Sequence, residues 1–349
     1  MKKQKRFSRK TLFYVLTAFG VLLACVGTAL LLYLRDGGET VTTFSMGSYV
    51  QQTVYGRDAA KNAGLAANAV AELDDLISWR REGDVAALNR LAGTEFISLD
   101  PRTAQVLDTA LSVCEKGGGA FDITIAPISR LWDFDENPHL PDDGLIQRFL
   151  DKVDYTSLSV LGDGTAALRQ YDTALDLGAV GKGAACDAAV EVYRDTRVTR
   201  AIVAVGGSIG LYGEKPFHEP WKIAVRDPFS DGMIGMLSLS GGNFISTSGD
   251  YEKFFTENDK TYHHILDPAT GYPAESGLSG VTIVSTGGTL SDALSTACFV
   301  LGLDEGPALL KEFSAEGLFI TPDKRLFITA GLYEAFELTR SDVTVEILP

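Results

Sequence analysis

The feature that most constrains this chain is a charge-free apolar stretch near its N-terminus. Residues 11–34 carry no charged side chain, and the ten residues before them carry six positive charges and no acid. A helix of these 24 residues is long enough to cross a hydrocarbon core of about 30 Å and too long for the apolar region of a cleaved signal peptide. Because basic flanks stay in the cytoplasm, we expect residues 1–10 to be cytoplasmic, residues 11–34 to be a transmembrane signal anchor, and residues 35–349 to form one extracytoplasmic domain of a single-pass protein of the cell membrane.

The cysteines leave one alternative to this topology. A lipoprotein signal could end at Cys25, but the apolar run continues for nine residues beyond it and Leu23 fits such a site poorly, which favours the uncleaved anchor. The other three cysteines, Cys114, Cys186 and Cys298, lie among apolar or small residues without CxxC or Cys/His spacing. We therefore expect buried free thiols and no disulfide framework.

The charge of the exported part limits its partners. Without the six positive charges of the first ten residues, the net charge of −15 becomes −21. Such a balance repels phosphate backbones, so nucleic acid is not an expected partner. An anionic ligand would have to be held locally, by backbone N–H groups, a metal ion or a few placed cations.

The pattern of elements predicts an α+β fold with mixed, largely antiparallel sheets and packed helices. Apolar residues recur at helical spacing over Asp58–Ser78, Asp100 and Pro101 open a second helix that continues to Glu115, and a third covers Gly183–Arg194. Short strands follow one another without regular βαβ alternation, which argues against a Rossmann fold. The expected strands are Thr42–Tyr55, Ser157–Leu161, Ala166–Gln170, Arg200–Val205, Trp221–Val225, Gly235–Leu239, Phe244–Ser246 and Gly280–Val284.

A carboxylate and a hydroxyl share one helix face near residue 292. Asp292 and Thr296 are four residues apart in a segment that reads as a helix start, with Thr289 or Ser291 available as its cap. Hard oxygen donors suit Mg²⁺, which takes few protein ligands and completes its octahedron with water and phosphate. The alternative is an acid favoured by the helix dipole in the first turn and a packed threonine.

A glycine-rich turn precedes the third helix, in the segment LDLGAVGKGAACD of residues 175–187. Such a turn lets the backbone approach a ligand and directs N–H groups at an anion, and Lys182 adds a cation there. Phosphate contact is one interpretation, and an ordinary strand-to-helix turn is the other. Asp187 lies one turn into the helix, where capping would be its structural role.

Two further positions are candidates for ligand contact. Asp122 lies between Phe121 and a β-branched residue, where an unpaired carboxylate would be costly to bury. Its partner is either a ligand or backbone N–H groups. His263 and His264 are adjacent and would point to opposite faces of a strand, so they would not chelate one metal together. His264 is either a contact to an aromatic cofactor or a hydrogen-bonded turn residue.

Taken in order, these segments resemble the FAD:protein FMN transferase (ApbE-type) family over roughly residues 42–340. The resemblance begins at Met46-Gly47-Ser48 and continues through FDITIAPISRLW, LDLGAVGKGAACD, VAVGGSIG, WKIAVRDP, STSGDYEKFF, YHHILDPATGYP and SDALSTACFVLG. The sequence departs from the common family pattern at Ser48, where Thr is usual, and in GAVGKG, where GGIAKG is frequent. The first departure keeps a hydroxyl, and the second keeps the turn and the lysine.

The resemblance implies an ApbE-like α+β fold with FAD in a cleft and a bound Mg²⁺ ion. The implied metal ligands are the side chains of Asp292 and Thr296 and the backbone carbonyl of Ala179. The positions that match the family's flavin-nucleotide contacts are Met46, Trp79, Ala120, Phe121, Asp122, Lys182, His264 and Leu266.

The resemblance also implies a reaction, in which a Thr or Ser hydroxyl of an acceptor protein attacks the pyrophosphate of FAD. FMN becomes attached through a phosphoester bond and AMP is released. Asp292 and Lys182 would serve the chemistry, and Asp250 is a candidate base for the incoming hydroxyl. The implied acceptor is an exported protein with a flavinylation motif, such as a membrane electron-transfer subunit. The alternatives are a Mg²⁺-dependent FAD pyrophosphatase and a surface FAD-binding protein.

Overall fold

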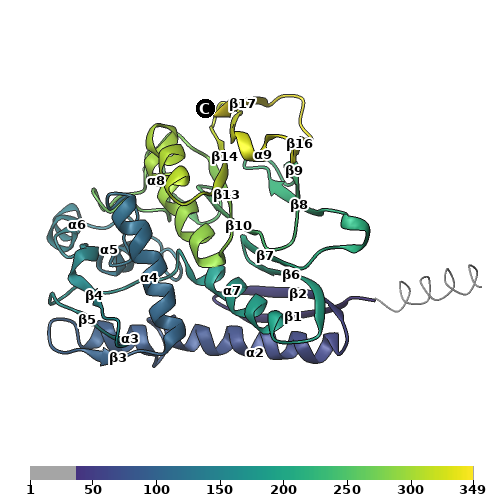
Figure 1. Cartoon of the computed structure of the whole chain (residues 1–349). Helices are drawn as coiled ribbons and strands as arrows, with labels where there is room; N and C mark the ends of the chain where they lie inside the picture. The colour runs from purple at the N-terminus through teal and green to yellow at the C-terminus, as the bar shows by residue number, and fades with distance from the viewer. Residues whose placement is uncertain (1–36, 349) are drawn as a thin grey trace, which may run out of the picture.

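A nine-stranded sheet forms the centre of the molecule (Figure 1) in the computed structural model, which describes residues 37–348. Neighbouring strands are antiparallel except for β15 and β17, which are parallel. In spatial order the strands are β1 (Glu39–Ser45), β2 (Ser48–Gly56), β6 (Val198–Val205), β7 (Ser208–Tyr212), β10 (Phe244–Gly249), β13 (Gly280–Ser285), β14 (Glu316–Ile320), β15 (Arg325–Thr329) and β17 (Thr344–Leu348). The predicted mixed, largely antiparallel α+β architecture is therefore confirmed.

Smaller sheets accompany the large one. The first contains β3 (Ile97–Ser98), β5 (Thr165–Leu168) and β4 (Leu158–Val160), the second β11 (Phe254–Glu257) and β12 (Lys260–His263), and the third β16 (Phe336–Leu338), β9 (Met233–Leu239) and β8 (Trp221–Arg226). Sequence periodicity missed β3, β7, β11, β12 and the C-terminal strands β14 to β17, which are short or rely on cross-strand packing for their stability.

The helices lie beside the sheet and in the part of the molecule that carries the small sheet β3-β5-β4 (Figure 1). They are α2 (Ala59–Ile77), α3 (Asp84–Arg90), α4 (Pro101–Lys116), α5 (Ala126–Trp132), α6 (Asp143–Leu150), α7 (Gly181–Arg194), α8 (Gly288–Glu312) and α9 (Ala330–Tyr333), with 3₁₀ turns at Tyr155–Ser157 and Pro216–His218. All three predicted helices are confirmed. The Asp100 side chain accepts a hydrogen bond from the Arg102 N–H at the start of α4, and α7 begins two residues earlier than predicted.

The predicted strand Thr42–Tyr55 is wrong as a single element, because it is a hairpin of β1 and β2. Met46 and Gly47 form the two-residue turn with φ of 53° and 66°. Positive φ at both positions is the type I′ geometry that matches the twist of the flanking strands. Methionine is not a turn-forming residue, so the sequence pattern carried no signal for this turn.

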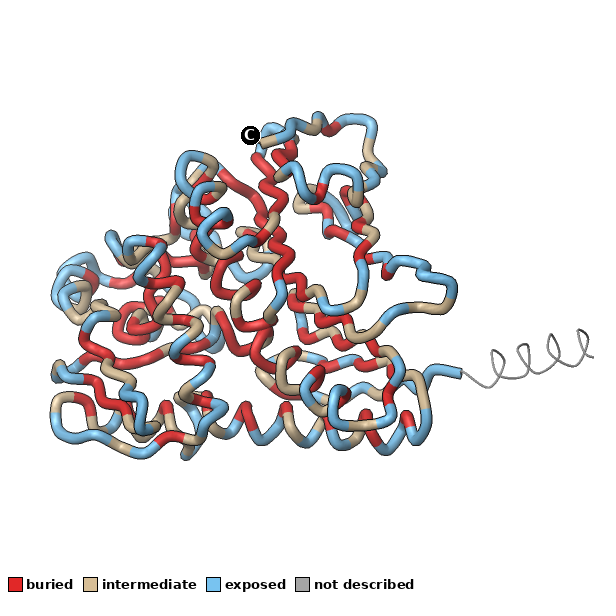
Figure 2. The backbone as a smooth tube through the Cα atoms, viewed as in Figure 1, coloured by how far each residue is buried: buried red, intermediate tan, exposed pale blue. Residues whose placement is uncertain are grey.

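The core lies where α7 and α8 pack against each other and the large sheet, with α4 packed on α8 (Figure 2). Within residues 37–348, only α8 is long and apolar enough to span a membrane, and 56% of its apolar window is buried inside the protein, which identifies it as a core helix. The predicted membrane anchor, residues 11–34, lies outside the described residues. Cys114, Cys186 and Cys298 are buried free thiols, as predicted.

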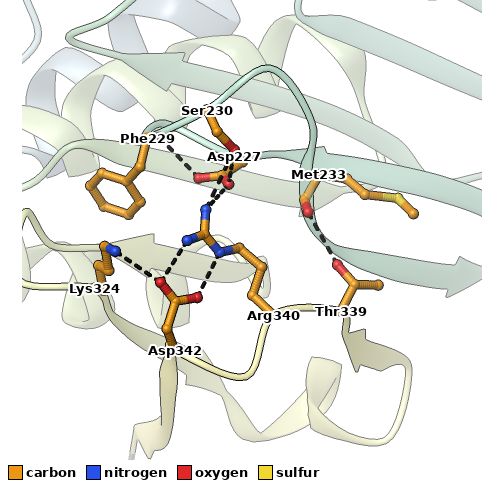
Figure 3. A network of polar contacts seen from close by, with 8 residues as sticks. All are labelled: Asp227, Phe229, Ser230, Met233, Lys324, Thr339, Arg340 and Asp342. Carbon is orange, nitrogen blue, oxygen red and sulfur yellow. Dashed lines mark hydrogen bonds and ion pairs between the residues drawn. The ribbon is translucent and has the colours of Figure 1, made fainter.

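A charged network fixes the small sheet β16-β9-β8 to the C-terminal segment (Figure 3). Arg340 pairs with Asp227, just after β8, and with Asp342, just before β17. Lys324 pairs with the same Asp342 carboxylate at 2.8 Å. Asp227 is 2% exposed, so its charge is compensated by Arg340 and by the Ser230 hydroxyl and Phe229 N–H. We assign this network a structural role.

Candidate active site

The first turns of α7 and α8 meet at two glycines. A Cβ atom on Gly183 would lie 2.0 Å from the Gly288 carbonyl oxygen and 2.8 Å from the Asp292 Cβ, and one on Gly288 would lie 2.2 Å from the Gly183 carbonyl oxygen. Only glycine permits this approach. The Gly183 N–H lies in the first turn of α7, where backbone N–H groups have no acceptor within the helix. It donates instead to Asp292 Oδ2 at 2.9 Å.

Asp187 makes the reciprocal contact. Its carboxylate accepts hydrogen bonds at 2.7 Å from the backbone N–H groups of Gly288 and Thr289 and from the Thr289 hydroxyl. Burial raises the pKa of the Asp187 carboxyl, and these three donors act against that shift. The capping role of Asp187 is confirmed, but it caps α8 and not its own helix. The expectation that Thr289 or Ser291 caps α8 is wrong, because the helix begins at Gly288.

We expect Asp187→Ala to lower the free energy of unfolding by about 2 kcal/mol, because it leaves two buried N–H groups of α8 without an acceptor. Urea unfolding of the detergent-solubilised chain, followed by circular dichroism, measures the change. Asp304→Asn, at an exposed position of the same helix, is the matched control and should change stability by less than about 0.5 kcal/mol. Equal stabilities of the Asp187→Ala chain and the wild type would contradict the capping role.

Asp292 lies in a lattice of hydroxyl groups. It is 4% exposed, and its Oδ1 accepts from the Ser208 hydroxyl at 3.1 Å. Ser208 is bonded to Ser246 at 3.0 Å, and Ser246 to Ser291 at the same distance. One turn further along α8, the Thr296 hydroxyl lies 3.3 Å from that of Ser248. Of the predicted pair, Asp292 therefore contacts β7 and Thr296 contacts β10, in polar surroundings.

The glycine-rich turn and the β1–β2 hairpin meet beside this lattice. A Cβ atom on Gly206, in the turn between β6 and β7, would lie 3.0 Å from Lys182 Cδ and 3.1 Å from Ser48 Oγ. Met46 is held by Asp74, whose Oδ2 accepts from its N–H at 2.9 Å. The structure thus brings two predicted flavin contacts, Lys182 and Met46, to one place through elements far apart in the sequence.

Asp122 makes the contacts of a backbone cap. It is 6% exposed, and Oδ1 accepts from the Thr124 N–H at 2.7 Å and from the Thr124 hydroxyl at 2.6 Å, while Oδ2 accepts from the Tyr155 N–H at 2.9 Å. Burial raises its pKa, and these donors oppose the rise. The carboxylate thereby orders the segment that includes Ala120 and Phe121.

His263 and His264 face different surroundings, as predicted. The Nε2 atom of His263 lies 3.1 Å from the Ala274 carbonyl oxygen, and its ring lies 5.5 Å from that of Phe299. His264 instead points toward Phe134, at 6.5 Å between ring centroids. Its Nδ1 atom is buried without a hydrogen-bond partner among residues 37–348. A buried polar atom without a partner needs an explanation, and a bound ligand is one.

Burial, reinforced by the charges of Lys253 and Lys182, lowers the pKa of His264 to about 4. The folded imidazole is therefore neutral between pH 4 and its ordinary pKa of 6.5, whereas the unfolded one takes up a proton. Stability should fall as the pH drops through this window. We expect His264 to lower the unfolding free energy by about 2 kcal/mol between pH 7 and pH 5, while the raised pKa of Asp250 acts in the opposite direction. Urea titrations of wild type and His264→Gln at both pH values isolate the contribution of the histidine as the difference between the two chains; an equal change with pH in both would contradict the assignment.

A small cluster of cations surrounds Trp79. The guanidinium groups of Arg80 and Arg130 each lie 4.5 Å from its ring centroid. Arg80 and Lys253 both pair with Asp135, at 3.0 and 2.6 Å. Local positive charge therefore lies beside Trp79, a predicted flavin contact, although the chain as a whole is strongly acidic. An anion-binding site on such a chain needs placed cations of this kind.

Three residues at this centre were missed by sequence analysis. Ser208 is one hydroxyl among many, so no signal marked it. The Oε1 atom of Glu252 would lie 3.4 Å from a Cβ atom on Gly207. Glu252 follows the candidate base Asp250 by two residues, so the same motif could have pointed to it. Asp74 had a usable signal, because it falls on the apolar stripe of α2 with Leu73 and Ile77, where a buried acid requires a partner.

Two further predicted positions are Leu266 and Asp250. Leu266 is 8% exposed and packs in a cluster with Trp132, Tyr262 and Ile128. Asp250 is half-buried at the end of β10, and burial raises its pKa to about 6. Such a carboxyl can accept a proton near neutral pH.

Fold and site together define an α+β enzyme with a buried carboxylate, neutral oxygen donors and nearby cations around one centre. The sequence profile of the ApbE family matches residues 46–319. This chain belongs to the ApbE family, and the prediction that it is an enzyme is confirmed. It is 35% identical over 272 residues to the FAD:protein FMN transferase of Treponema pallidum, which covers 73% of this chain and 75% of that protein.

Solved structures agree with this assignment. The ApbE protein of Thermotoga maritima is similar with a TM-score of 0.74 and 28% identity, over 87% of this chain and 97% of that one. The apo form of the flavinyl transferase ApbE of Pseudomonas stutzeri is similar with a TM-score of 0.76 and 26% identity, over 86% and 97%.

Proposed function

We propose that the chain transfers the FMN half of FAD to a Thr or Ser hydroxyl of an acceptor protein and releases AMP. A bond forms between the hydroxyl oxygen and the phosphorus of FMN, the bond from that phosphorus to AMP breaks, and the hydroxyl proton leaves. Membership of the ApbE family and the relatives named FAD:protein FMN transferase support this function. The observation that carries it is the buried Asp292 carboxylate, held at the meeting point of α7 and α8 beside Thr296 and Lys182.

The residues at this point fit Mg²⁺. Within residues 37–348 no cluster of three or more His, Cys, Asp or Glu side chains could hold a metal ion, so a site here would combine one carboxylate with neutral oxygens. Asp292, Thr296 and the Ala179 carbonyl provide such a set, and no hydrogen bond to the Ala179 carbonyl is present among the described residues. All donors are hard oxygens, as Mg²⁺ prefers. When bound, Mg²⁺ neutralises charge on a diphosphate.

The chain's own groups would bind and orient FAD. Among the described residues the charge of Lys182 is felt by the Glu252 carboxylate, whose pKa it acts to lower, and we expect its ammonium group to bind a phosphate of FAD. The flavin would contact the remaining predicted positions, and the unpaired Nδ1 of His264 could accept a hydrogen bond from it. The flavin contacts that we propose are Met46, Trp79, Ala120, Phe121, Asp122, His264 and Leu266.

A base must take the proton of the incoming hydroxyl. Asp250 is our candidate, because its pKa of about 6 leaves it ionised yet able to accept a proton near pH 7. Its carboxylate has no hydrogen-bond or ion-pair partner among the described residues apart from its own backbone.

We also propose that the enzyme acts on the extracytoplasmic side of the cell membrane, anchored by residues 11–34. Its acceptor would then be an exported protein on the same side, such as a membrane electron-transfer subunit. The charge-flanked apolar run supports the anchor.

The test is to incubate the detergent-solubilised chain with FAD, Mg²⁺ and an exported domain that carries a Thr-containing flavinylation motif. We expect flavin fluorescence that stays with the acceptor after denaturation, with one AMP released for each flavin attached. AMP release without labelled acceptor would favour an FAD pyrophosphatase. FAD binding without any AMP would favour a surface FAD-binding protein.

A further inference from the structure

Two aromatic side chains are exposed at the tip of the β1–β2 hairpin. Phe44 is 68% exposed and Tyr49 is 71% exposed. The two residues are cross-strand partners on either side of the Met46–Gly47 turn. Their rings meet edge to face, with centroids 5.7 Å apart and an interplanar angle of 86°. Each ring thereby orders the other without burying it, which presents a preformed apolar surface to solvent.

The hairpin face that carries this aromatic pair is uncharged. Along each strand every second side chain points toward α2, as Val50 and Val54 do on β2. The opposite face has the composition Thr40, Thr42, Phe44, Tyr49, Gln51 and Thr53. In a chain of net charge −15, a charge-free strip with two exposed aromatics has the composition of an interface centre, where charged residues are depleted and aromatics enriched.

The hairpin tip is joined directly to the candidate active site. The Tyr49 carbonyl accepts a hydrogen bond from the Gly206 N–H at 3.4 Å. A Cβ atom on Gly206 would contact both Ser48 Oγ and Lys182 Cδ, and one on Gly181 would lie 3.6 Å from Met46 Sδ. Phe44 and Tyr49 point to the face of the hairpin opposite α2 and α7, so a molecule that rests on them would reach Lys182 around the Met46–Gly47 turn.

The open edge of β1 suits an extended partner. Within residues 37–348, β1 pairs only with β2 and forms one end of the nine-stranded sheet. Its outer edge offers unpaired N–H and C=O groups to an extended segment. A protein whose hydroxyl must enter the site could approach along this edge.

We propose that the aromatic pair Phe44–Tyr49 is the docking surface for the acceptor protein, which contacts it through an apolar side chain near the hydroxyl that receives FMN. The inference rests on the proposed function, because that function requires a protein to present its hydroxyl beside Lys182. It assigns the acceptor to the β1 side of the site.

The experiment compares wild type with the double variant Phe44→Ser/Tyr49→Ser, using the full-length chain in detergent and the exported acceptor domain described above. Binding of the acceptor to the immobilised enzyme is measured separately from FMN transfer, FAD affinity and AMP formation without acceptor. We expect acceptor binding to weaken, and the KM for acceptor to rise, by at least about tenfold. FAD affinity and acceptor-independent AMP formation should stay within twofold of wild type.

Two control variants separate docking from folding. Phe44→Tyr/Tyr49→Phe keeps both rings and should bind the acceptor like wild type. Ile347→Ser removes an apolar side chain that is 52% exposed on β17, the other end of the same sheet, and should have no effect on acceptor binding.

The outcomes distinguish this proposal from the proposed function. Unchanged acceptor binding in the double serine variant overturns docking at this pair, even if transfer occurs. A parallel loss of FAD affinity also overturns it, because the pair would then belong to the cofactor site. Acceptor binding that depends on the pair without FMN transfer supports docking and sinks the transferase activity. Self-association of the wild type that the double variant lacks, with acceptor binding unchanged, identifies the surface as a dimer contact instead.

Discussion

Asp292→Asn is expected to reduce AMP formation from FAD by about a thousandfold, equivalent to roughly 4 kcal/mol of transition-state stabilisation. The substitution keeps the size of the side chain and an oxygen that can accept from the Gly183 N–H, so the meeting of α7 and α8 should survive. What it removes is the charge, the one carboxylate in the proposed set of oxygen donors. Single-turnover assays with excess FAD and Mg²⁺ measure the loss.

Two comparisons make this result specific to the metal. Chelation with EDTA should bring wild type to the level of the variant, and added Mg²⁺ should restore wild type alone. Calorimetric titration with Mg²⁺ provides a readout independent of turnover and should show binding lost in Asp292→Asn. Asp304→Asn, on the exposed side of α8, should behave like wild type. If the Asp292 variant kept more than a tenth of the activity, the metal assignment would be wrong.

Trp132→Ala should give the largest loss of stability, about 3–5 kcal/mol. Trp132 is fully buried, with Phe134, Tyr262, Phe255 and Tyr272 around it at centroid distances of 5.4 to 6.2 Å. Its indole N–H donates to the Gly271 carbonyl oxygen at 2.8 Å, so truncation both opens a cavity and leaves a buried acceptor unpaired.

Urea unfolding followed by far-UV circular dichroism tests the prediction, and Trp132→Phe is the matched control. Phenylalanine keeps most of the packing and loses the hydrogen bond, so it should cost about 1–2 kcal/mol. The cluster also supports β12 and the residues after it, including His264, so FAD affinity should fall in the alanine variant. A destabilisation below 1 kcal/mol would show that this cluster does not hold the segment.

Several parts of the site could be predicted from local sequence. Helical spacing puts Asp292 and Thr296 on one face, and the family resemblance made them candidate metal ligands. The glycine turn with Lys182 was recognisable because only glycine tolerates such close backbone approaches. The acidic balance of the chain predicted that local cations would be needed to bind an anion, and Arg80 and Arg130 are such cations.

Other parts were out of reach for physical reasons. The cap of α8 is Asp187, about 100 residues away in sequence, and no spacing rule links two helices that meet only in the folded chain. Asp122 left two alternatives open, and it acts as a cap through a local contact with Thr124 and a tertiary contact with the Tyr155 N–H. The Met46–Gly47 turn was hidden because methionine is not a typical residue for a type I′ turn.

By itself, the sequence determined the α+β class and the family resemblance, and it predicted the membrane anchor and the candidate site residues. These follow from periodicity, charge and local motifs, which are short-range properties of a chain. Only the tertiary structure decided which of those residues lie together, that two glycines bring α7 against α8, and that Phe44 and Tyr49 stand exposed beside the site. These are contacts between distant segments, and they exist only once packing has brought those segments together.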